Sequence, residues 1–157
     1  MTNFHPFTPA CAGLLAICPA AMTGWALRAS GGLISHGVLE LGPPEPEGPA
    51  LCDLRLARWL NSRVKHAGPI AAISVVVLPP FMASPMEPDP ATVLRSWAAL
   101  RGIGFDLMTY ATLLSSPAGN QPLKRSHTAQ AGGSACHAEA IAIAALDQML
   151  SNLEATA

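Results

Sequence analysis

The stretch that most restricts the fold is Ile70–Leu78, IAAISVVVL, an almost unbroken run of apolar and largely β-branched residues. Residues of this kind favour a β-strand, and a strand with apolar side chains on both faces has to be covered on both faces. The run therefore predicts a central strand in a layered α/β domain, with helices above and below the sheet.

Other apolar segments supply the remaining elements. Three strands in succession predict an antiparallel meander, and the later alternation of strand and helix predicts parallel connections. The fold class is therefore α/β, with a mixed five-stranded sheet and helices on both faces. The expected strands are Leu14–Ile17, Gly24–Ala29, Leu33–Leu41, Ile70–Leu78 and Phe105–Tyr110, and the expected helices are Ala50–Lys65, Ala91–Arg101 and Ala135–Leu153, the last with Ser134 as N-cap.

The length of 157 residues fits one domain over residues 1–157, with residues 1–10 expected to form a flexible tail. Half of the residues are hydrophobic and only 12% are charged. No window holds 18 uninterrupted apolar residues and the start lacks a basic n-region, so we expect no membrane association and no signal peptide. The surplus of apolar residues predicts a homodimer or another protein interface.

The four cysteines, Cys11, Cys18, Cys52 and Cys136, form no CxxC pair. Without a secretion signal, this spacing predicts reduced thiols and a cytoplasmic location.

The charge balance does not indicate a nucleic-acid-binding protein, because nine Lys and Arg stand against ten Asp and Glu. Binding would need a local basic patch or a surface pooled across a dimer. The best candidate is the loop Pro122–Ser134, where Lys124, Arg125 and His127 are the expected contacts to a phosphate backbone.

Two motifs resemble those of a known family. The stretch LLAICPAAMTGWALR is similar to the opening hairpin of the RuvC-type Holliday-junction resolvases, in which a strand runs into Asp-Pro-Gly and then Thr-Gly-aromatic. It keeps Thr23, Gly24 and an aromatic residue, but has Cys18 in the aspartate position. The stretch CHAEAIAIAAL resembles the family's last helix, Asp-x-x-Asp-Ala-aliphatic-Ala, with Cys136 and Glu139 in the acidic positions.

The resemblance covers residues 13–150 and implies a ribonuclease H-like fold. It places Ser74 where the family has a buried glutamate. The family chemistry uses about four acidic side chains around two Mg²⁺ ions, and Mg²⁺ prefers oxygen ligands. Three of the four positions, Cys18, Ser74 and Cys136, are not acidic, and Glu139 is the only retained acid. The resemblance therefore implies a catalytically degenerate domain without a bound metal.

Other chemistries fit the motif residues less well. Cys18, Cys136 and His137 have donors that suit a soft metal such as Zn²⁺, but buried thiols also pack as small apolar groups. A zinc deaminase is excluded because no cysteine follows Glu139. Cys136, at a helix N-terminus, is a candidate nucleophile. The alternative is that its thiol is inert.

Three hypotheses follow. The first is a RuvC-like protein that binds branched or duplex DNA, or supports a protein assembly, without cutting. The second is an active metal-dependent Holliday-junction endonuclease, with Mg²⁺ held by Glu139 and further carboxylates. The third is a structural subunit with no nucleic-acid role. The candidate carboxylates for the second hypothesis are Asp53, Glu87, Asp89 and Asp106.

Overall fold

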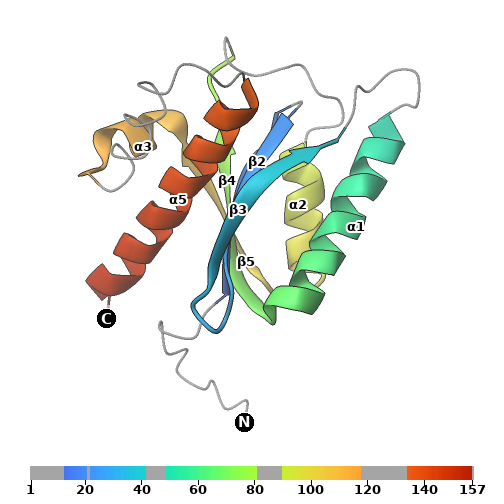
Figure 1. Cartoon of the computed structure of the whole chain (residues 1–157), viewed down its shortest axis with the longest axis horizontal. Helices are drawn as coiled ribbons and strands as arrows, with labels where there is room; N and C mark the ends of the chain where they lie inside the picture. Colours follow the sequence, from blue (N-terminus) through green and yellow to red (C-terminus); the bar gives the residue numbers. More distant parts are fainter. Residues whose placement is uncertain (1–12, 21, 42–48, 81–89, 118–133, 157) are drawn as a thin grey trace.

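Figure 1 shows the computed structural model of the chain, which describes residues 13–20, 22–41, 49–80, 90–117 and 134–156. The expected tail at 1–10 lies outside the described residues, as do the basic loop residues Lys124, Arg125 and His127.

The strands form one five-stranded sheet in the order β3-β2-β1-β4-β5. β1 pairs antiparallel with β2, and β2 with β3, whereas β1–β4 and β4–β5 are parallel. This arrangement confirms the predicted mixed sheet, with the apolar run in a central strand. The strands are β1 (Gly13–Cys18), β2 (Met22–Arg28), β3 (Ile34–Glu40), β4 (Ile70–Val77) and β5 (Gly104–Thr109).

Helices cover both faces of the sheet, as the burial of both faces of β4 requires (Figure 1). On one face, α1 (Pro49–Ala67) and α2 (Pro90–Ala99) pack on a core of large side chains that includes Leu15 and Ile73. On the other face, α5 (Ser134–Thr156) and the short α3 (Tyr110–Ser115) pack on smaller ones such as Ala16 and Ala26.

The structure differs from the expected elements mainly after β5. Tyr110 begins α3 instead of ending the strand, because the side chain of Thr109 accepts a hydrogen bond from the backbone N–H of Thr112 and caps the helix. Ser134 is the first residue of α5, and its side chain lies outside the described residues. Within the described ranges, no helix combines the length and apolar character needed to cross a bilayer.

The backbone of α5 approaches the sheet closely at Gly24 in β2. A Cβ atom added to Gly24 would lie 2.0 Å from the carbonyl oxygen of Ala138 and 2.4 Å from the backbone nitrogen of Glu139. The side chains of α5 that face the sheet are small, among them Ala138, Ala142 and Ala145. The missing side chain at position 24 therefore lets the first turns of α5 lie directly on the backbone of β2.

We predict that Gly24→Ala lowers the free energy of unfolding by about 3 kcal/mol, the upper end of the usual cost of overpacking, because backbone atoms cannot move aside as a flexible side chain can. Chemical denaturation followed by circular dichroism measures the change. Gly31→Ala is the matched control, since nothing lies within 4 Å of a Cβ atom there. Equal stability of the two variants would show that α5 does not depend on this contact.

Candidate functional site

The first candidate residue, Cys18, ends β1 on the face that α5 covers. It has no exposed surface, and this burial raises the pKa of its thiol from the ordinary 9.0 to about 12. The side chain is therefore neutral at physiological pH. The position in which the resemblance expects a charged carboxylate is occupied by a small apolar group.

The turn after Cys18 is closed by Thr23. The Thr23 hydroxyl donates a hydrogen bond to the carbonyl oxygen of Ala20 over 2.8 Å, and this side chain is buried. The turn directs the chain back so that Gly24 pairs with Cys18 across β1 and β2. Thr23 and Gly24 thus have structural roles, in turn closure and in the close approach of the helix.

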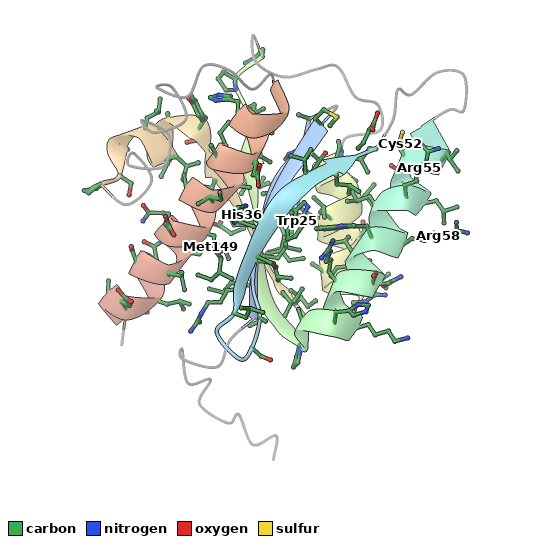
Figure 2. All side chains as sticks on the ribbon, in the orientation of Figure 1. Trp25, His36, Cys52, Arg55, Arg58 and Met149 are labelled. Atoms are coloured by element: carbon green, nitrogen blue, oxygen red, sulfur yellow. The ribbon has the colours of Figure 1, made fainter. Side chains whose placement is uncertain are left out.

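Glu139, the acid that the resemblance assigns to the last helix, is hydrogen-bonded to a histidine from β3. The Nδ1–H of His36 donates to the Oε1 of Glu139 over 2.6 Å, and the two side chains are 51% and 26% exposed. His36 pairs with Ala26 in β2, so it lies on the α5 face of the sheet (Figure 2). Sequence analysis missed His36, because the two residues are 103 positions apart and no motif joins them.

Ser74 lies within β4 on the same sheet face, with 1% of its surface exposed. Its register partner in β1 is Ala16, so Ser74 is two residues, about 7 Å, short of the level of Cys18. Val76, next on that face of β4, is buried and apolar. Neither β4 residue supplies a carboxylate. The Ser74 hydroxyl also has no hydrogen-bond partner among the described residues.

Tyr110 and His137 lie near the end of β1. Their ring centroids are 6.4 Å apart, with the rings at 66°. Partial burial, and then the charge that Cys18 would carry, raise the pKa of Tyr110, which places its phenol beside the thiol. The side chain of Cys136 lies outside the described residues. Within the described part of the chain, no group of three or more His, Cys, Asp or Glu could hold a metal ion.

The alternative carboxylates divide between the two faces. Asp53 is on α1, on the opposite side of the sheet from Glu139, and burial raises its pKa. Asp106 in β5 is exposed and is the register partner of Ser74. Glu87 and Asp89 lie outside the described residues.

These donors do not fit Mg²⁺. A hard divalent cation needs several oxygen ligands with negative charge, whereas this site presents a neutral thiol, one buried hydroxyl and a carboxylate already bound to an imidazole. At the end of β1, the described side chains offer one carboxylate, that of Glu139, and it is hydrogen-bonded to His36.

An α/β domain with three leading antiparallel strands, two parallel ones and helices on both faces has a ribonuclease H-like fold. The particular version is that of RuvC. The chain is similar to a structure of T. thermophilus RuvC in complex with Holliday junction substrate, with 16% sequence identity, a TM-score of 0.61, and 93% of this chain and 98% of that one covered. It is also similar to a Thermus thermophilus RuvC structure, with 15% identity, a TM-score of 0.57, and 92% and 97% covered.

No protein-family model matches the sequence, and no curated protein matches it significantly by sequence. The structural likeness establishes the fold that the hairpin and last-helix motifs predicted.

We predict that Cys18 resists alkylation at mildly alkaline pH. The thiolate is the reactive form, and a pKa of about 12 in place of 9.0 lowers its population by about 1,000-fold. Peptide mapping after iodoacetamide treatment should find Cys18 unmodified in native protein and modified in urea. Because the pKa is raised, reactivity should increase only as the pH approaches 12. Rapid modification at pH 8 would contradict this account of the site.

We further predict that Ser74→Ala is neutral or raises the free energy of unfolding by up to about 1 kcal/mol, because it removes a buried hydroxyl without a partner. The matched control is Thr23→Val, which removes a bonded hydroxyl and should cost about 1 kcal/mol. Denaturant titrations of both variants measure the difference. Destabilisation of Ser74→Ala by more than the control would mean that the Ser74 hydroxyl makes a contact.

Proposed function

We propose that the chain is a RuvC-like protein that binds branched or duplex DNA without cutting it, as a binding or assembly module. One observation carries the proposal. The strand end where a metal-binding carboxylate is expected holds the buried, neutral Cys18. A catalytic Mg²⁺ would lose its central ligand there, and an uncharged thiol does not replace it.

The state of Glu139 supports the same proposal. In a working two-metal site this carboxylate would face a cation, whereas here it accepts a hydrogen bond from His36. The hydrogen bond from the imidazole occupies one oxygen of the carboxylate within the protein itself. The pair joins α5 to the edge strand β3.

Nucleic-acid binding is proposed from the fold and from the residues of the basic loop. One of the structures with this fold holds a Holliday junction substrate. Lys124, Arg125 and His127 remain the predicted phosphate contacts. We also propose a homodimer, since large apolar side chains such as Leu33 and Ile34 are exposed at the turn between β2 and β3.

A rearranged metal-dependent nuclease is the second candidate, and Asp106 is the observation that favours it. This carboxylate lies on β5 beside Ser74 and is open to solvent. With Glu139 it would give two acids on one sheet face. The candidate requires the metal to displace His36 from Glu139 and to avoid the thiol of Cys18.

We predict structure-selective binding of a fluorescent four-way junction over a matched duplex, with no cleavage in the presence of Mg²⁺. Binding is measured by fluorescence anisotropy over a range of salt concentrations, and the products are resolved on a denaturing gel.

Two variants test whether any cleavage seen on the gel comes from this site. Cutting that is lost in Glu139→Gln or Asp106→Asn, but kept in the exposed control Glu154→Gln, would overturn the proposal and establish the nuclease. Absence of binding at low salt would instead leave the structural-subunit hypothesis, with a protein as the partner.

A further inference from the structure

The described charges are divided between the two faces of the sheet. Six of the seven described Lys and Arg lie on α1, on α2 or in the turn after α2, where Asp53 is the one described carboxylate. The opposite layer has the reverse character, since α5 carries three carboxylates and no Lys or Arg. The six are Arg55, Arg58, Arg63, Lys65, Arg95 and Arg101.

The outer side of α1 carries the most accessible of these charges. Arg58 and Lys65 are both exposed and stand seven residues apart, which is two helical turns or about 10 Å on the same side. Figure 2 shows Arg58 extending from α1 away from the sheet. Successive phosphates of one DNA strand are spaced by about 3.4 Å along the duplex axis, so the two side chains span about three phosphates.

The seam between α1 and α2 continues the positive surface. Asn61, between Arg58 and Lys65, accepts hydrogen bonds from Nη2 of Arg101 over 2.8 Å and from Nε1 of Trp97 over 3.1 Å. The guanidinium carbon of Arg101 lies 4.3 Å from the centroid of the Trp97 ring. A neutral amide and an aromatic face thus fix this cation at the seam without neutralising it.

Two further arginines are held in the same way. The guanidinium carbon of Arg63 lies 4.5 Å from the Trp25 ring centroid, and that of Arg95 lies 5.3 Å from the Phe105 ring centroid. Within the described ranges, neither arginine forms an ion pair with a carboxylate. Their charge is therefore available to an outside anion, and their geometry is partly fixed before binding.

From this layout we propose that the α1/α2 layer, on the opposite side of the sheet from Cys18 and Glu139, is the surface that binds the phosphate backbone of duplex DNA. The inference rests on the proposed function and assigns its main contact to Arg58, Lys65 and Arg101. A guanidinium stays charged and can donate two parallel hydrogen bonds to phosphate oxygens. The carboxylates of α5 repel the same backbone.

The layout also disfavours a second copy as the occupant. Two α1/α2 layers facing each other would bring like charges together, whereas a polyanion neutralises them. Binding on this layer leaves the duplex on the far side of the sheet from the Cys18 site. This separation distinguishes a binding module from a resolvase.

The test compares two double variants of the full chain in a salt titration of duplex binding. For Arg58→Ala with Lys65→Ala, the slope of log K against log salt should fall in magnitude by about 0.9 for each lost contact, hence by nearly 2. Lys124→Ala with Arg125→Ala removes the same charge from the loop and should change the slope less. Glu154→Gln, on α5, controls for net charge.

Ser62→Glu provides a second, independent variant. It places a carboxylate between Arg58 and Lys65 on an exposed helical position and should weaken binding while the helix is kept, as circular dichroism will confirm. Loss of binding only in the loop variant would overturn this inference and leave the proposed function standing. Failure of the unaltered protein to bind DNA at low salt would overturn both.

Discussion

The contact between Gly24 and the first turns of α5 determines how Cys18, Glu139 and His36 lie relative to one another. Because no side chain separates β2 from the backbone of Ala138 and Glu139, α5 lies directly on the sheet beside the end of β1. That approach buries Cys18 and brings Glu139 within reach of His36 on the edge strand. A side chain at position 24 would hold α5 away from the sheet, and Cys18, Glu139 and His36 would no longer lie close together.

The same close approach explains the chemistry of the site. Packing small side chains of α5 against the sheet excludes water from the end of β1, and burial in such surroundings favours a neutral group over a charged one. A thiol tolerates this environment, as the raised pKa of Cys18 shows, whereas an isolated carboxylate would need a metal or another cation beside it. Glu139 lies at the more exposed margin and is hydrogen-bonded to His36.

The fold could be predicted from the sequence because its determinants are local. The apolar run of β4 required cover on both faces, the three leading apolar segments predicted the antiparallel meander, and the hairpin and last-helix motifs indicated the ribonuclease H-like fold. The boundary at Tyr110 was wrong because a single side-chain cap at Thr109 decides between strand and helix. A cap of this kind depends on backbone geometry that apolar periodicity does not report.

The site was less accessible to sequence reasoning. Cys18 and Glu139 could be located through motifs. His36 belongs to no motif, and only the strand register places it on the same sheet face as Glu139. The level of Ser74 relative to Cys18 likewise depends on how two parallel strands align, which side-chain pattern alone does not fix. The basic residues of α1 can be seen in the sequence. Only the structure shows that they lie in a different layer from the carboxylates of α5.

The central claim is that the carboxylate of Glu139 is satisfied by His36 and does not bind a catalytic metal ion. The most direct measurement is a titration of the protein with Mn²⁺, as a substitute for Mg²⁺, followed by electron paramagnetic resonance of the free ion. The account predicts that the unaltered protein and Glu139→Gln leave the same amount of free Mn²⁺. Stoichiometric binding by the unaltered protein that disappears in Glu139→Gln would contradict the account and show that Glu139 is a metal ligand.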